Sequence, residues 1–229
     1  MIYSPSPKYK LILASKSPRR QELLKQLGWS FEIKTKEVEE NFPLHLTKEQ
    51  VALYLAELKA KAFEEELNDN TVVITADTIV CIDNLILGKP TDYDDAVRIL
   101  NILSGKKHEV ITAVCLRSKE KQKSFFISSY VYFKKLTDEE INYYITNYKP
   151  FDKAGSYGVQ DCLPAEVNFC SYDEMEFLKR MDKINLWKII RHQDTQAGIG
   201  FVLIEKIDGS YFNVMGLPVK ELYEELQKF

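Results

Sequence analysis

The stretch LILASKSPRRQELLKQLG, residues 11–28, joins a short apolar run to an amphipathic segment. Leu11–Ala14 is typical of a buried strand. A helix start follows, because the oxygen of Ser17 can cap free N–H groups and Pro18 lacks an N–H that would be left unpaired. A segment with a leucine-rich face then runs to Gly28, a residue that suits the end of a helix. A strand leading directly into a helix predicts an α/β fold.

Later segments continue this alternation of strands and helices. Strands are expected at residues 31–35, 71–75, 79–82, 85–87, 109–117, 125–134, 199–207 and 211–214. Helices are expected after the capping sequences Thr47-Lys-Glu-Gln50, Thr91-Asp-Tyr-Asp94 and Thr137-Asp-Glu-Glu140, and from Pro218 onward. Tight hairpins are expected at Asp83-Asn84 and at Asp208-Gly209. The pattern favours a mixed sheet with helices around it, in a single domain spanning residues 1–229.

The segment 161–196 does not follow this alternation of strands and helices, because it has no alternating apolar pattern typical of a strand. Within it, Glu174–Ile190 is charged and helix-like, and it carries the aromatic residues Phe177 and Trp187. We interpret 161–196 as an insertion between two elements of the sheet, a surface appendage that contributes no catalytic group. Its apolar residues must be covered, either by the lobe beneath or by a second subunit.

Composition excludes several classes of protein. The chain has 229 residues, 45% of them hydrophobic, and a net charge of −3, so a broad basic surface for nucleic acid is not indicated. No apolar run approaches the ~18 residues that cross a membrane, and the N-terminus lacks the apolar core of a signal peptide. The four cysteines include no Cys-x-x-Cys pair, which favours a cytoplasmic protein.

Arg19 and Arg20 lie in the first turn of the expected helix, where the helix dipole is already positive. Each cation there costs about 0.3–1 kcal/mol. A bound anion would offset that cost, because free N–H groups, Ser15, Ser17 and two guanidinium groups would all surround it. A phosphate chain is the candidate. The alternative is that both arginines are solvated and pair with a nearby acid. If they bind phosphate, removing either cation should leave the free protein as stable or slightly more stable, because repulsion at the helix start is relieved.

Acidic residues provide a second candidate feature. Asp77 interrupts the apolar run VVITADTIVCI, residues 72–82. A buried carboxylate must be paired, bound to metal or located where a strand meets a cleft, unless Asp77 only caps a turn. The run Glu37-Val-Glu-Glu40 could supply a carboxylate to a hard cation beside phosphate, or it could be a solvated loop. Lys59 and Lys89 are either phosphate ligands or surface lysines.

The stretch KAGSYGVQ, residues 153–160, contains a small-residue pattern like that around a nucleophilic serine. A serine hydrolase would use Ser156 with His192 or His108 as its base. The helix that should follow such a serine is missing, which weakens this alternative. The three histidines have no metal-ligand spacing, so zinc is not expected.

Eight stretches together resemble the Maf family of nucleotide pyrophosphatases. In chain order they are LASKSPRRQELL, EVEE, LAELKA, ADTIV, LGKP, LSGKKHEVITAV, DKAGSYGVQ and IDGSYFNVMGLP. The resemblance runs from about Tyr9 to the C-terminus and omits 161–196. It implies a mixed, twisted α/β sheet in two lobes around a central cleft, similar to the inosine triphosphate pyrophosphatase fold.

The resemblance also implies an activity and a site. It implies that a nucleoside triphosphate is hydrolysed to the monophosphate and pyrophosphate with a divalent metal, Mg²⁺ or Mn²⁺. Transferred by position, the triphosphate ligands are Arg19, Arg20, Lys59 and Lys89, with Ser15 near the phosphates. Glu40 and Asp77 would serve the metal and the attacking water, with Asp77 as the proton acceptor. Thr78 and Gln160, with Arg19, match the subgroup that resembles dTTP/UTP pyrophosphatases. A homodimer is a further expectation, and a catalytically weak nucleotide-binding protein is the alternative.

Overall fold

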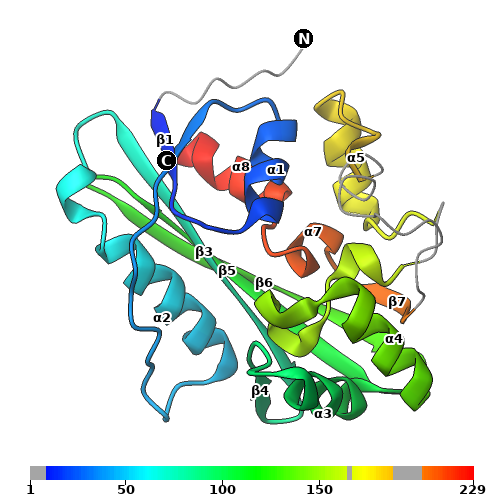
Figure 1. Cartoon of the computed structure of the whole chain (residues 1–229). Coiled ribbons are helices and arrows are strands. Elements are labelled where there is room, and N and C mark those ends of the chain that lie inside the picture. Colours follow the sequence, from blue (N-terminus) through cyan, green and yellow to red (C-terminus); the bar gives the residue numbers. More distant parts are fainter. Residues whose placement is uncertain (1–8, 164–166, 188–202) are drawn as a thin grey trace.

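The computed structural model describes residues 9–163, 167–187 and 203–229 and contains one mixed sheet (Figure 1). Its strands are β1 (Lys10–Leu13), β2 (Phe31–Ile33), β3 (Thr71–Ile82), β4 (Leu85–Leu87), β5 (Lys107–Arg117), β6 (Gln122–Phe133) and β7 (Ile204–Asp208). Their order is β2-β1-β3-β5-β6-β7, with β4 paired to β3. β1 runs parallel to β2 and β3, and the remaining pairs are antiparallel. The prediction of a mixed α/β fold is confirmed.

The helices begin largely where the capping sequences predict. They are α1 (Pro18–Gln26), α2 (Lys48–Lys61), α3 (Tyr93–Leu103), α4 (Asp138–Tyr148), α5 (Tyr172–Arg180), α7 (Tyr211–Val214) and α8 (Val219–Lys228), with short 3₁₀ helices η1 (Glu64–Glu66), η2 (Pro150–Asp152), η3 (Ala154–Ser156) and η4 (Val159–Asp161). Complete capping boxes start α2 at Thr47 and α4 at Thr137. Asp92 caps α3 by accepting a hydrogen bond from the N–H of Asp95.

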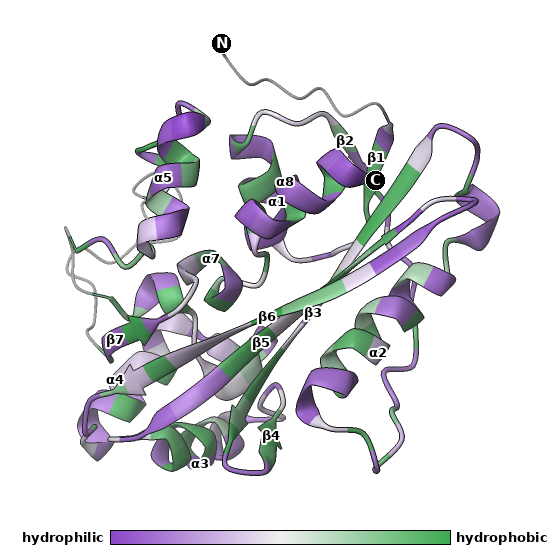
Figure 2. Ribbon diagram, turned by 180° about the vertical axis from the view of Figure 1, so that it is seen from behind, coloured by the Kyte–Doolittle hydropathy of each residue, from purple (hydrophilic) through white to green (hydrophobic). Residues whose placement is uncertain are grey.

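The two faces of the sheet are covered by different helices. Ala52, Ala56 and Ala60 of α2 pack against one face of β3 and β5. Leucines of α1, α3 and α8 belong to the larger core on the other face. Figure 2 shows hydrophobic and hydrophilic residues together along α2 and α3, as expected of helices with one buried face. In Figure 1 the long strands β3, β5 and β6 connect a group containing β1, α1 and α8 to a group containing β4 and α3.

The hairpin predicted at Asp208-Gly209 is wrong. The chain leaves β7 and forms the short helix α7 instead of a strand. Ser210 caps α7 by accepting a hydrogen bond from the N–H of Asn213 at 2.9 Å. The side-chain amide of Asn213 donates at 2.9 Å to the carbonyl of Val110 in β5. These bonds satisfy the backbone and the polar side chains without a returning strand. The hairpin predicted at Asp83-Asn84 is confirmed, with Ile82 and Leu85 paired across it.

The helix predicted over Glu174–Ile190 is interrupted in the structure, and residues 186–187 are helical again after the break. α5 ends at Arg180, and Asp182 takes a left-handed φ of 55°. Residues 188–190 lie outside the described residues. Phe177 and Leu178 on the inner face of α5 are buried in the larger core, so the rest of the chain covers them. The assignment of 161–196 as an insertion stays a prediction.

Candidate active site

A cleft lies beside the middle of β3, because β3 extends further than its neighbour β1. β1 ends at Leu13, opposite Ile74, whereas β3 continues to Ile82. β4 pairs only with the last three residues of β3. The middle of β3 therefore lies beyond the carboxyl end of β1, which is where open α/β sheets place their ligand sites. A cleft of about 770 Å³ occupies this place, and the segments that follow β1, β2 and β4 line it.

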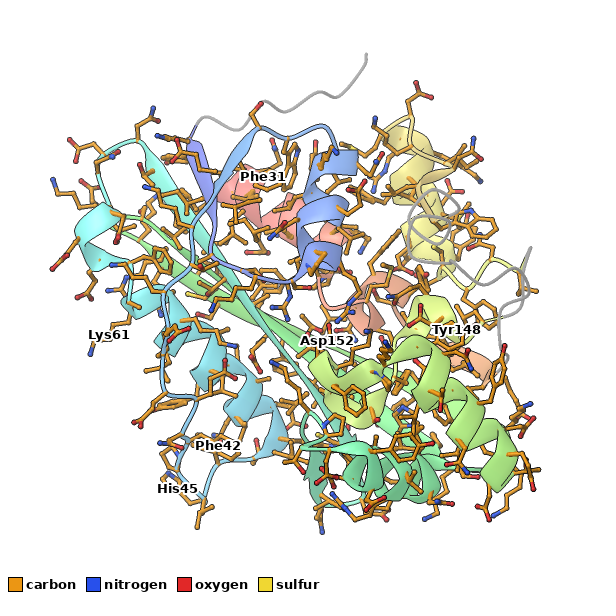
Figure 3. All side chains as sticks on the ribbon, viewed as in Figure 1. Phe31, Phe42, His45, Lys61, Tyr148 and Asp152 are labelled. Carbon is orange, nitrogen blue, oxygen red and sulfur yellow. The ribbon has the colours of Figure 1, made fainter. Side chains whose placement is uncertain are left out.

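This cleft brings together every site residue that the family resemblance implied. They are Ser15, Arg19, Arg20, Glu40, Lys59, Asp77, Thr78, Lys89 and Gln160. Lys16, Lys36, Asp152 and Lys153 also line the cleft and had no role in the sequence prediction. Figure 3 labels Phe42, on the segment between β2 and α2, and Asp152, on the segment after α4; both belong to the lining.

The cleft is basic although the chain is acidic. Among the described residues, seven cationic and four acidic side chains line it, whereas the whole chain carries a net charge of −3. Concentrating cations in one concave site raises the local potential and attracts an anion. The cleft therefore suits a ligand with several negative charges.

Asp77 is the most buried carboxylate of the cleft. Its residue is 7% exposed, and Lys59 of α2 donates a hydrogen bond to its Oδ1. Burial in the protein raises the pKa of Asp77 above its usual range, and the neighbouring charge of Lys59 opposes that rise only in part. A raised pKa in a cleft is typical of a group that exchanges protons in a reaction.

Lys59 links two carboxylates. Its Nζ lies 3.0 Å from Oε1 of Glu40 and also contacts Asp77. The oxygens of Glu40 and Asp77 therefore gather around one cationic group. Carboxylate oxygens are the ligands that Mg²⁺ and Mn²⁺ prefer, and one or two suffice for Mg²⁺ when phosphates supply the others. Among the described residues there is no group of three or more acidic, histidine or cysteine side chains that could hold a metal ion.

The backbone N–H groups at the start of α1 have no side-chain cap. Ser17 stands at the N-cap but its side chain makes no capping hydrogen bond. Instead, the N–H of Ser17 donates to Oγ of Ser15 at 3.2 Å. Among the contacts of the described residues, Arg19 makes only a long ion pair, 3.8 Å from Asp152. A helix start with uncapped N–H groups and a loosely held guanidinium is suited to bind phosphate.

Arg20 has different surroundings, because protein acceptors take most of its donors. Its Nε donates to the carbonyl of Gly216 at 2.7 Å. Its Nη1 donates to the carbonyl of Ala76 at 2.8 Å and contacts Oγ of Ser15 at 3.5 Å, and its Nη2 donates to Oγ1 of Thr78 at 2.9 Å. Burial lowers the pKa of Arg20 to about 10, so the group stays charged near neutral pH. The expectation that removing either arginine relieves repulsion therefore does not extend to Arg20.

The serine-hydrolase alternative finds no support in the described residues. Ser156 is fully buried, its Oγ has no hydrogen-bond partner, and it is absent from the cleft lining. Nε2 of His108 lies 2.8 Å from the hydroxyl of Tyr157, and the described contacts include no hydrogen bond between His108 and Ser156. Burial lowers the pKa of His108 to about 3. The other proposed base, His192, lies outside the described residues.

Most of the sequence matches a known protein family. The family model described as "Maf-like protein" matches residues 10–172 and 193–229. A dTTP/UTP pyrophosphatase of Phocaeicola vulgatus is 46% identical over 222 residues, which cover 96% of this chain and 96% of that protein. A dTTP/UTP pyrophosphatase of Porphyromonas gingivalis is 42% identical over 225 residues, which cover 97% of this chain and 95% of that protein.

Two solved structures resemble part of the chain. The Ham1 protein of Staphylococcus aureus matches with a TM-score of 0.41 and 14% identity, over 54% of this chain and 71% of that chain. A dITP/XTP pyrophosphatase of Mycobacterium abscessus matches with a TM-score of 0.36 and 16% identity, over 56% of this chain and 75% of that chain. At these TM-scores the two likenesses add nothing to the fold described above.

Proposed function

This chain belongs to the Maf-like protein family, and on that premise we propose that it hydrolyses dTTP and UTP to the monophosphate and pyrophosphate. The observation that carries the proposal is the basic cleft at the edge of β3, with the buried carboxylate of Asp77 inside it. The names of the similar proteins, dTTP/UTP pyrophosphatases matched over nearly their whole length, support the choice of substrate.

The triphosphate is proposed to lie against the start of α1. Arg19, Lys59 and Lys89 would contact the phosphates, with the free N–H groups of the first turn. Arg20 would add positive charge, while most of its own donors remain on the protein. Ser15, whose Oγ accepts the N–H of Ser17, would fix the shape of this anion site.

A divalent cation is part of the proposal. Glu40 and Asp77 would hold Mg²⁺ or Mn²⁺, because carboxylates are the ligands these ions prefer. Both carboxylates also contact the ammonium group of Lys59, so their oxygens lie around one positive charge. When bound, such an ion neutralises the negative charge that develops on the phosphates during the reaction.

Asp77 is proposed to act as the general base. Its carboxylate would accept a proton from a water molecule as the water oxygen attacks the α-phosphorus. The bond between that phosphorus and the bridging oxygen then breaks, and pyrophosphate leaves with the electron pair. The cationic side chains of the cleft stabilise the charge on the departing pyrophosphate.

Thr78 and Gln160 are proposed to help select the pyrimidine base. Both line the cleft, and Gln160 is only 3% exposed, so it occupies a protected part of the wall.

The enzyme is proposed to act in the cytoplasm, which is supported by the four cysteines being free thiols. A homodimer stays a prediction. None of the helices in the described ranges combines the length and the apolar character that crossing a bilayer needs.

The proposal is tested by a substrate panel. The purified protein would be incubated with dTTP, UTP, dCTP or 7-methyl-GTP and Mg²⁺, and the products separated by anion-exchange chromatography. We expect dTTP and UTP to give the monophosphate and pyrophosphate, and EDTA to stop the reaction. Binding of these nucleotides without turnover would support the nucleotide-binding alternative. Inorganic phosphate as the first product would overturn the proposed reaction.

A further inference from the structure

A buried carboxylate lies outside the cleft, in the part of the chain that the family model passes over. Glu174 on α5 is 1% exposed. It falls within residues 173–192, which the family model does not match. Its Oε1 accepts hydrogen bonds from Oγ of Ser210 at 2.6 Å and from the N–H of Phe212 at 3.0 Å. Its Oε2 accepts from the N–H of Tyr211 at 3.1 Å and from the N–H of Ser171 at 2.8 Å. All four partners are donors, so the group is held as an acceptor-only carboxylate.

The bonds from Glu174 fix the start of α7, and α7 in turn is bonded to the sheet. Ser210 accepts the N–H of Asn213 at 2.9 Å. The side chain of Asn213 accepts the N–H of Thr112 at 3.0 Å and donates to Val110 and Ser129, both at 2.9 Å. α7 is therefore held from one side by α5 and from the other by β5 and β6.

The same bonds continue from α7 to the cleft. The hydroxyl of Thr112 donates to the carbonyl of Asn213 at 2.8 Å. Because that hydroxyl has one proton, the hydroxyl of Thr78, 2.9 Å away, must be the donor between the two threonines. Oγ1 of Thr78 then accepts from Nη2 of Arg20. The direction of every bond from Arg20 to Asn213 is thus determined.

A second route reaches Arg20 through the backbone after α7. The N–H of Gly216 donates to the carbonyl of Asn213 at 2.9 Å, and the carbonyl of Gly216 accepts Nε of Arg20 at 2.7 Å. Gly216 has a φ of 99°, and a Cβ there would lie 3.2 Å from Oγ1 of Thr78. Both routes therefore converge on the guanidinium of Arg20.

We propose that Glu174 is a positioning residue: by holding α7 it sets the position of Arg20 and Thr78 in the cleft. The role of these two residues toward nucleotide rests on the proposed function. Replacing the carboxylate by an amide places an NH₂ group against N–H and O–H donors. The start of α7 then shifts, and the Gly216 carbonyl and Asn213 shift with it.

The first test compares Glu174→Gln with Glu176→Gln. Both substitutions remove one negative charge from α5, but the side chain of Glu176 is 41% exposed and pairs only with Lys179 among the described contacts. We expect Glu174→Gln to lower kcat/KM for dTTP about tenfold, mainly through KM, a size typical of coupling within one network. Glu176→Gln should leave kcat/KM unchanged. Equal kcat and KM in the two variants would overturn the proposal.

The second test is a double-mutant cycle with Arg20→Lys, which removes the forked guanidinium on which both routes converge. In the Arg20→Lys background, Glu174→Gln should change kcat/KM less than about twofold. A purely structural role for Glu174 predicts the same factor in both backgrounds, together with a lower Tm, and that result would contradict the proposal.

A third readout does not depend on activity. The Nε–H of Arg20 can be followed by ¹⁵N NMR, and its exchange with solvent should become about tenfold faster in Glu174→Gln than in the wild type or Glu176→Gln. If the wild type hydrolyses no nucleotide, the proposed function fails, whereas this measurement still decides whether Glu174 holds Arg20. Unchanged exchange in Glu174→Gln would overturn the inference.

Discussion

Arg19 and Arg20 are adjacent in the sequence, yet their guanidinium groups have different surroundings. Arg19 is held by one long ion pair and lies free for a ligand. Arg20, in the first turn of α1, donates hydrogen bonds to the carbonyl of Ala76 in β3 and to the carbonyl of Gly216 after α7. The sequence shows two equivalent cations at a helix start, and only the structure separates a loosely paired arginine from one whose donors are mostly taken by protein acceptors.

The two arginines should therefore differ in their effect on stability. Arg20→Ala leaves the carbonyls of Ala76 and Gly216 without their donor, and we expect the free energy of unfolding to fall by about 2–3 kcal/mol. Arg19→Ala should change it by less than about 0.5 kcal/mol and should weaken nucleotide binding. Urea unfolding without nucleotide measures both. Equal stability of the two variants would show that the bonds of Arg20 contribute nothing.

Asp77→Asn should lose activity without losing the fold. We expect kcat for dTTP to fall about 10²–10⁴-fold, the usual range for a positioned base. Because burial opposes the charge of Asp77, the amide should leave Tm unchanged or higher. Steady-state kinetics and thermal unfolding of the same preparation test both expectations. A variant with near wild-type kcat would refute the role of Asp77 as base.

At the scale of elements, α5 should be part of the core. Phe177 is 1% exposed in the larger core, so Phe177→Ala should lower the free energy of unfolding by about 3–5 kcal/mol. Tyr172→Ala on the same helix is the matched control, because Tyr172 is 78% exposed and should cost less than about 0.5 kcal/mol. Chemical denaturation compares them. A Phe177→Ala variant as stable as Tyr172→Ala would mean that α5 is only a surface appendage.

Local signals explain which elements were predictable from the sequence. The capping boxes at Thr47 and Thr137 act within four residues, so the sequence was sufficient to place α2 and α4. The prediction of a hairpin at Asp208-Gly209 failed because the chain forms helix α7 there, and α7 depends on distant partners. Its Asn213 donates a hydrogen bond to Val110 in β5. A turn signal cannot reveal a tertiary contact of that kind.

At the scale of the molecule, the cleft residues were predictable as a set while their contacts were not. The family motifs name residues from Ser15 to Gln160, and the end of β1 beside the longer β3 brings them together. The carbonyls that hold Arg20 belong to Ala76 and Gly216, which lie in two of the eight family stretches but were given no role by the resemblance. Such backbone partners follow from the topology of the sheet, which the motifs do not encode.

The buried charge of Asp77 should make stability depend on pH. Its pKa is raised in the folded protein, so its contribution to stability is present at low pH and is lost as pH rises through that folded-state pKa. At about pH 7, Asp77→Asn should thus be at least as stable as the wild type, and any advantage should shrink toward about pH 4, close to the ordinary Asp pKa. Thermal unfolding of both proteins in EDTA measures the difference. An advantage that grows on acidification would contradict the sign.

Attack of water on the α-phosphorus, with Asp77 taking the proton, is the central claim. Hydrolysis of dTTP in H₂¹⁸O tests it most directly, because the label marks the phosphorus that water attacks. With Mg²⁺ present, mass spectrometry should find one ¹⁸O atom in the monophosphate and none in the pyrophosphate. Label in the pyrophosphate, or in inorganic phosphate released first, would contradict the account.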